Sequence, residues 1–213
     1  MNRIYLYGFT LFFSFQMLMA PANVYAKPQE SCISQSKVEF ENQFRRLWVD
    51  HVLWTSNYIT SATTADAKDQ KQVLNRLLKN QEDIGNSLKP LYGEKAGNEL
   101  TTLLKEHIVL AGKIVEAAKQ KDEPLVGQLT KEWNRNADQI ADFLSKANPY
   151  LKNDELKQLL RTHLTLVTND LVSSLEKNWD GRIASINEGV SHIIMMSDVI
   201  SKAVEKQFPD AFN

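Results

Sequence analysis

Three short stretches of the sequence share one pattern and decide the fold: LWVDH at 47–51, LLKEH at 103–107 and LLRTH at 159–163. Each begins with leucine and ends with histidine, and the histidines are spaced 56 residues apart. Apolar residues on both sides keep this spacing without a gap, as Phe44 and Leu100 do. The pattern predicts an internal repeat of 56 residues. The expected copies span 38–93, 94–149 and 150–207.

Within each copy the apolar residues follow the periodicity of an amphipathic helix rather than that of a strand. Leu100, Leu104 and Ile114, for example, share one helical stripe with His107. Turn-forming residues such as those at 63–66 divide each copy into two helices, and Pro or Gly separates the copies. The predicted fold class is therefore all-α, a six-helix bundle made of three repeated antiparallel helical hairpins. The six expected helices span 38–62, 69–89, 95–119, 124–147, 153–177 and 181–207.

The first residues have the features of a secretory signal peptide. Asn2 and Arg3 precede an apolar run over 4–19, and the small-residue exit VYA follows at 24–26. A membrane anchor is the alternative, but polar residues interrupt the run, which is short for a span. We therefore expect residues 1–26 to be a signal peptide, which would place the mature protein in the periplasm or outside the cell.

The rest of the chain is expected to form one domain without a transmembrane segment. Residues 27–37 are predicted to be a flexible tail, and the helical domain covers 38–213, a length typical of a single domain. Cys32 is the only cysteine, so it could join two copies in a homodimer or stay a free thiol in the tail. The charge is nearly balanced, with 25 basic and 26 acidic side chains, which argues against nucleic acid as a partner.

Each expected hairpin places two polar residues level with each other on its inner face. His51 lies about as far before the first turn as Asn80 lies after it, and antiparallel helices rise equally from a shared turn. The predicted facing pairs are His51 with Asn80, His107 with Asn136, and His163 with His192. All four histidines of the sequence should therefore lie in one inner layer with two asparagines.

This polar layer is the candidate functional site. Burying such groups without partners costs about 1–3 kcal/mol each, so they must bind one another, water or a ligand. Neutral imidazole is the commonest protein ligand of transition metals and haem iron, which makes a transition metal ion or haem the expected cofactor. The candidate metal ligands are His51, His107, His163 and His192. The residues expected to orient the rings from outside are Asn80, Asn136, Asp83, Asp142 and Asp198.

Two other interpretations stay open. The layer could serve only to fix helix register in a structural or protein-interaction module, as buried polar groups sometimes do in helical bundles. An enzyme ranks third, because the sequence lacks the Glu-x-x-His pairs of di-iron bundles, Cys-x-x-Cys-His, His-Glu-x-x-His, Gly-rich phosphate loops and Gly-x-Ser-x-Gly. The favoured function is a non-enzymatic exported protein that binds a metal, haem or small ligand at the inner layer.

Several phrases resemble an uncharacterised family of bacterial exported all-α proteins. They are LWVDH at 47–51, LLKEHI at 103–108, NAD at 136–138 and QFP at 207–209. The resemblance spans most of the chain after residue 26 and implies an all-α fold. Members of that family are sometimes labelled glycosyltransferase, but no motif for glycosyl transfer is present, so the resemblance implies no activity.

Overall fold

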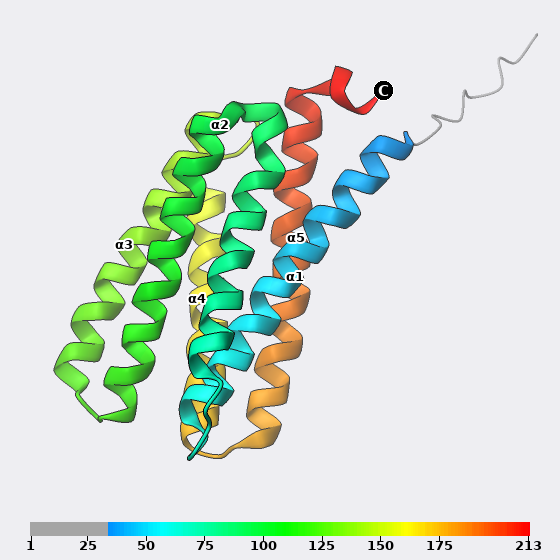
Figure 1. The fold of residues 1–213 in the computed structure, drawn as a ribbon. Coiled ribbons are helices and arrows are strands. Elements are labelled where there is room, and N and C mark those ends of the chain that lie inside the picture. The colour runs from blue at the N-terminus through cyan, green and yellow to red at the C-terminus, as the bar shows by residue number, and fades with distance from the viewer. Residues whose placement is uncertain (1–33) are drawn as a thin grey trace, which may run out of the picture. The chain divides into compact units, whose positions relative to one another are not determined.

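The computed structural model describes residues 34–213, and the predicted signal peptide, Cys32 and most of the predicted tail lie outside this range. Within it the chain is all-α, as predicted, with five α-helices and one short 3-10 helix (Figure 1). The elements are α1 (Gln35–Thr63), α2 (Gln70–Lys119), α3 (Glu123–Ala147), α4 (Asn153–Leu175), α5 (Trp179–Gln207) and η1 (Pro209–Phe212).

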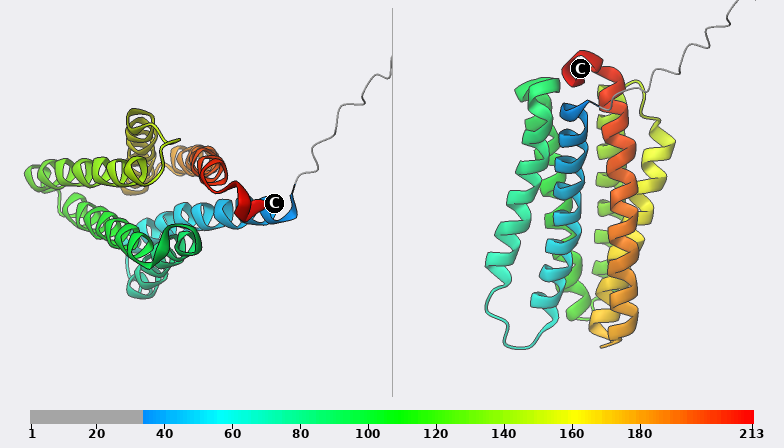
Figure 2. Two further views of the ribbon diagram at one scale, coloured as in Figure 1. Left: turned by 90° about the horizontal axis from the view of Figure 1, so that it is seen from above. Right: turned by 90° about the vertical axis from the view of Figure 1, so that its right-hand side faces the viewer.

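The helices form a bundle in which sequence neighbours pack side by side. Each α-helix contacts the next along the chain, and α1 also packs against α5 and, over a smaller area, against α4. The side view in Figure 2 shows the helices running alongside one another over most of their length. Their buried apolar faces form one core cluster, which extends from Phe44 in α1 to Val204 in α5.

Helix α2 covers two of the expected helices, 69–89 and 95–119, so six expected helices appear as five. Only Gly93 departs from helical geometry inside α2, with φ 83° and ψ 164°. Figure 1 shows the chain reversing direction there, so that α2 has two antiparallel arms. The arms approach closely at two glycines, because a Cβ on Gly85 would lie 2.6 Å from the carbonyl oxygen of Gly97.

Two polar residues from the predicted turns cap the amino-terminal ends of α3 and α5. The side chain of Asp122 accepts a hydrogen bond from the backbone N–H of Leu125 at 3.1 Å, and Pro124 occupies the first turn of α3. Asn178 likewise accepts from the backbone N–H of Gly181 at 3.0 Å at the start of α5. These caps satisfy backbone donors that have no partner within the helix.

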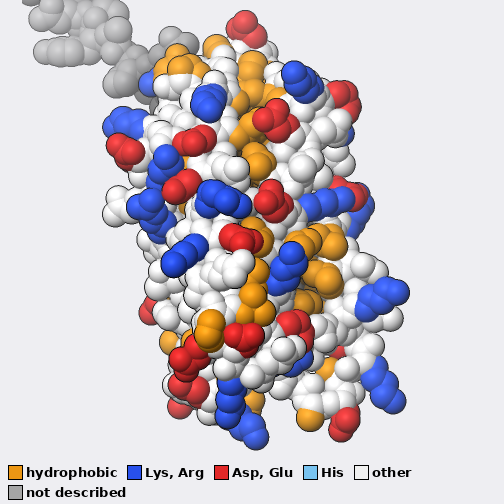
Figure 3. Space-filling model, turned by 90° about the vertical axis from the view of Figure 1, so that its left-hand side faces the viewer, with side chains coloured by type: hydrophobic (Ala, Val, Ile, Leu, Met, Phe, Trp, Pro, Cys, Tyr) orange, Lys and Arg blue, Asp and Glu red, His pale blue; other side chains and the backbone are white. Residues whose placement is uncertain are grey.

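The outer surface is polar, with charges of both signs. Figure 3 shows the side of the molecule on which α3 lies, where basic and acidic side chains are interspersed and apolar side chains run lengthwise between them. No helix between residues 34 and 213 combines the length and apolar character that a membrane span requires.

Candidate functional site: a histidine cluster in the core

Three imidazole rings from three helices meet in the core. His51 of α1, His107 of α2 and His163 of α4 are 2%, 3% and 3% exposed. The ring centroid of His163 lies 5.3 Å from that of His51 and 6.2 Å from that of His107. Each histidine belongs to the apolar stripe of its helix, so packing the stripes together brings the rings together.

Gln81 determines which nitrogen of His51 carries the proton. Its amide Nε2 lies 2.8 Å from the carbonyl oxygen of Leu77, 3.0 Å from Asn80 Oδ1 and 3.2 Å from His51 Nδ1. The two oxygens can only accept, so this end of the amide is its donor NH2 group. An amide nitrogen does not accept hydrogen bonds, so a proton on His51 Nδ1 would have no acceptor there, and the proton of the neutral ring lies on Nε2. His51 Nε2–H then donates to Nε2 of His163, 3.3 Å away.

The same reasoning assigns the proton of His163. Because His163 Nε2 accepts from His51, the neutral His163 ring carries its proton on Nδ1. This nitrogen is buried and has no hydrogen-bond partner in the described part of the chain. His163 therefore presents an unused donor to its surroundings.

His107 is oriented by Asn136, the residue predicted to face it. The Asn136 amide Nδ2 donates to the carbonyl oxygen of Leu103 at 3.1 Å, so its Oδ1 faces the ring. His107 Nδ1–H donates to this oxygen at 2.8 Å. The other ring nitrogen, Nε2, therefore holds a lone pair, and it too is buried without a partner among residues 34–213.

The cluster is uncharged at neutral pH. Burial, with a smaller effect from the nearby His107, lowers the pKa of His51 to about 3, and burial lowers the pKa of His107 to about 4. Burial, followed by the neighbouring imidazoles, holds the pKa of His163 well below its usual 6.5. Neutral rings keep the lone pairs that a metal ion or a hydrogen-bond donor can use.

The remaining three residues of the predicted layer bind backbone carbonyl groups. Side-chain nitrogens of Asn80, Asn136 and His192 lie 2.9, 3.1 and 2.9 Å from the carbonyl oxygens of Leu47, Leu103 and Leu159, respectively. Each bond spans 33 residues of sequence. His192 is therefore buried as expected, but its Nε2 points to a backbone oxygen and is not hydrogen-bonded to the other three rings.

The three aspartates predicted to orient the rings form ion pairs with surface cations. Asp83 lies 3.0 Å from Lys79, and Asp142 lies 3.1 Å from Lys157. Asp198 pairs with Arg45. The structure thus brings Asn80 and Asn136 into the polar layer. The three carboxylates pair with lysine or arginine side chains instead of with the histidine rings.

Gln81 belongs to the site although it is not among the residues predicted from the sequence. Its side chain is 0% exposed and contacts both His51 and Asn80. A signal is present, because Gln81 follows Leu77 by four residues and so continues the apolar stripe. The predicted 56-residue spacing gives no polar counterpart to Gln81, since Ala137 and Ile193 occupy the corresponding positions.

Two tryptophans border the cluster. The Trp48 ring lies 5.8 Å from the His51 ring, and the Trp133 ring lies 5.1 Å from the His107 ring, measured between centroids. Both indole nitrogens are buried, and neither has a hydrogen-bond partner in the range that the structure covers. The side-chain carbonyl oxygen of Gln81, Oε1, is also buried and has no hydrogen-bond partner in that range. The cluster thus contains several unsatisfied polar atoms, which is costly in a protein core.

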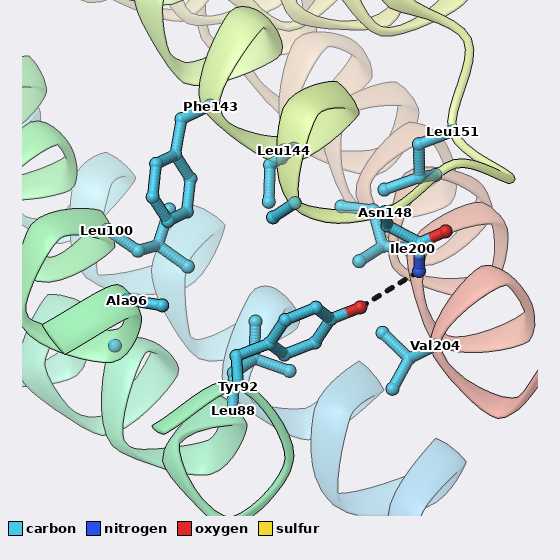
Figure 4. Close-up of a pocket in the computed structure, with 12 residues that line it drawn as sticks. Leu88, Tyr92, Ala96, Leu100, Phe143, Leu144, Asn148, Leu151, Ile200 and Val204 are labelled. Carbon is cyan, nitrogen blue, oxygen red and sulfur yellow. Dashed lines mark hydrogen bonds between the residues drawn. The ribbon is translucent and has the colours of Figure 1, made fainter. Parts of the chain in front are cut away.

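A cavity lies near the Gly93 turn, and its lining differs from that of the histidine cluster. It is lined mainly by apolar side chains, among them Leu88, Leu100 and Leu144 (Figure 4). At one side the Tyr92 hydroxyl accepts a hydrogen bond from Asn148 at 2.9 Å. This cavity offers few polar groups to orient a ligand, whereas the histidine cluster offers several.

In the described range, no group of three or more His, Cys, Asp or Glu side chains is already arranged around a common metal position. No protein-family profile matches the chain, and neither a curated protein nor a solved structure is similar enough to count as a match. The resemblance to an exported helical family therefore stays a prediction.

Proposed function

We propose that this is a non-enzymatic protein that binds one transition metal ion at the histidine cluster, through His51, His107 and His163. The observation that carries the proposal is the 3.3 Å separation of the Nε2 atoms of His51 and His163. Two nitrogens bound to one tetrahedral ion, each about 2.0–2.1 Å from it, are about 3.3–3.4 Å apart. The pair therefore has the spacing of one edge of a metal coordination tetrahedron.

His107 supplies the third ligand in this proposal. Its Nε2 lone pair is free, and Asn136 holds the opposite nitrogen as a hydrogen-bond donor. Metal-bound histidines usually donate their second N–H in this way, which fixes the ring and raises its basicity. Binding an ion would draw the His107 ring toward the other two, since the three nitrogens do not yet surround one point.

The cluster suits a single ion better than haem. Centroid separations of 5.3 and 6.2 Å place the rings against one another, which is too close to admit a porphyrin between them. Neutral imidazoles suit Zn, Cu and Ni.

The test is calorimetric titration of Zn²⁺, Cu²⁺ and Ni²⁺ into protein purified without a histidine tag, comparing wild type, His107→Ala and His163→Ala. We expect micromolar or tighter binding of at least one ion, weakened at least roughly tenfold in each variant. His192→Asn is the matched control, because asparagine occupies the corresponding positions 80 and 136 and makes the same bond to a backbone carbonyl.

Equal affinity in wild type and both alanine variants would contradict the proposal, and so would the absence of binding by all three ions. The second candidate function, a register device, would then account for the whole layer. That function is favoured by the three bonds to Leu47, Leu103 and Leu159, each spanning 33 residues. The same bonds support a bundle of three equivalent hairpins, in which α2 supplies the second helix of the first and the first helix of the second.

The place of action proposed for the protein is the periplasm or the cell exterior, on the basis of the signal-like sequence at 1–26. Expression of the full chain in a bacterial host and amino-terminal sequencing of the exported product would test this. We expect the exported protein to begin at Lys27; an uncleaved cytoplasmic product would contradict it.

A further inference from the structure

A narrow cavity lies between α1, α4 and α5, directly beside the histidine cluster. His163 and Asp170, two turns further along α4, both line it. Seven helical residues separate the two by about 10 Å. Thr55, Ser56 and Ser185 add polar groups to the walls. The histidine cluster thus adjoins a cavity along one side of α4, whose mainly apolar walls contain a few polar groups.

This cavity is lined by small and polar residues. At the positions 56 and 112 residues earlier in the sequence, larger side chains occupy the corresponding places. At the 56-residue spacing, Gly189 corresponds to Leu77 and Trp133. The latter two are 1% and 3% exposed, so both fill the core. A Cβ placed on Gly189 would meet only one atom, Val52 Cγ1, at 3.5 Å. The absent side chain therefore accounts for the open space.

Ser185 and Asp170 also lie at positions whose counterparts at the 56-residue spacing are apolar or aromatic. Ser185 stands where the spacing gives Val73 and Leu129 in the first two copies. Asp170 stands where it gives Tyr58 and Ile114, and both of those side chains are buried. The third copy thus has polar groups in place of bulkier side chains along one line that leads to His163.

Asp170, in the wall of the cavity, pairs with Arg182, whose side chain reaches solvent. Arg182 Nε donates to Asp170 Oδ1 at 3.0 Å, and Arg182 Nη2 donates to Ser56 Oγ at 2.8 Å. The Arg182 side chain is 19% exposed, whereas that of Asp170 is 7% exposed. A carboxylate at this point attracts cations, and the movable arginine side chain competes with them for it.

His163, in the wall of the cavity, carries an unused donor. Its Nδ1–H is buried and has no partner within the described residues, so it is free to donate a hydrogen bond to a water molecule. We propose that this cavity is the channel through which a metal ion reaches the histidine cluster. The inference rests on the proposed function. Because the free space fits only water-sized guests, passage through it limits the rate of binding.

Stopped-flow mixing with Zn²⁺ tests the channel through a pair of variants at one position. Gly189→Leu introduces the side chain found at position 77 and fills the cavity, whereas Gly189→Ala adds only a Cβ that fits. We expect association to be slowed roughly tenfold or more in Gly189→Leu and to stay within about twofold of wild type in Gly189→Ala. The equilibrium affinity should be the same in all three, since the ligands are untouched.

The outcomes separate the two proposals. Zn²⁺ binding with equal association rates in the leucine and alanine variants overturns the channel and leaves the metal site standing. Absence of Zn²⁺ binding to the wild type overturns the channel together with zinc as the ligand. If Gly189→Leu does not fold, as judged by circular dichroism, Ser185→Leu takes its place, because leucine is the residue at the corresponding position 129.

Discussion

Four of the six ring nitrogens in the histidine cluster have hydrogen-bond partners, and these partners determine where each neutral ring carries its proton. Backbone carbonyl oxygens fix the amides of Gln81 and Asn136, and these amides in turn fix His51 and His107. The arrangement ends in one bare lone pair and one unused N–H, on His107 and His163.

The depressed pKa values predict acid sensitivity. His107 has a folded pKa of about 4 and an unfolded value near 6.5, so the unfolded chain takes up the proton first and stability falls as pH drops from about 6.5 toward 4. In metal-free protein, His107→Gln should flatten this loss by up to about 1.4 kcal/mol per pH unit. Urea unfolding at several pH values measures it, and parallel stability curves for the two proteins would contradict the prediction.

The sequence could predict which residues are buried at the site but not how they are connected. All four histidines and both asparagines are buried, as the helical stripes indicate. Periodicity also explains two of the aspartates: Asp142 and Asp198 follow Asn136 and His192 by six residues, a rotation of about 240° that turns them to the outer side. Ring orientation depends on long-range partners such as Gln81 and Leu159, which no local pattern contains.

At the level of the helices, Gly93 is the position where the backbone depends on one residue type. Its φ of 83° lies in the region that side chains with a Cβ rarely adopt, although a Cβ there would meet no atom within 4 Å. Gly93→Ala should therefore destabilise the protein by about 1–2 kcal/mol through backbone strain alone. Thermal or urea unfolding measures the change.

Gly127 provides the control for that substitution. It lies within α3, where φ is helical, and a Cβ there would also meet nothing within 4 Å. Gly127→Ala should stabilise the protein by about 0.5–1 kcal/mol, since alanine loses less backbone entropy in a helix. Equal effects of the two substitutions would show that Gly93 is not strained.

The boundary within α2 illustrates what periodicity omits. Pro90 and Gly93 indicate a break, and the apolar stripe resumes after it, so the sequence predicts two helices. The structure has helical arms on both sides of Gly93 and reverses the chain with this single non-helical residue, a tighter turn than the expected gap between residues 89 and 95. A stripe shows which face is buried, whereas the width of a turn depends on backbone torsion at individual residues.

At the level of the whole molecule, Arg182 joins three helices through its bonds to Asp170 and Ser56. Arg182→Val should destabilise the fold by about 3 kcal/mol at pH 7, because the buried Asp170 carboxylate loses its cation. The double variant Asp170→Ile, Arg182→Val reproduces the residues at 114 and 126 and should recover much of that loss. Urea unfolding of the three proteins decides; a double variant less stable than the single one would contradict this account.

The contact of α1 with α5 could not be predicted from the sequence. The repeat spacing relates neighbouring hairpins to one another, but it does not determine whether the first and last helices meet. In the structure, Lys37 and Arg45 of α1 form ion pairs with Glu205 and Asp198 of α5. These pairs join residues far apart in sequence, which only the folded chain brings together.

The histidines lie near the middle of their helices, about 20 Å from either end of α1 in the case of His51. Fraying opens helix termini at little free-energy cost, whereas the central turns open only when most of the bundle does. Amide hydrogens around the carbonyl groups of Leu47, Leu103 and Leu159 should therefore exchange with solvent deuterium more slowly than those at the termini. Their exchange rates report global unfolding, so an ion that stabilises the fold would slow the exchange of these central amides and leave the frayed ends unchanged.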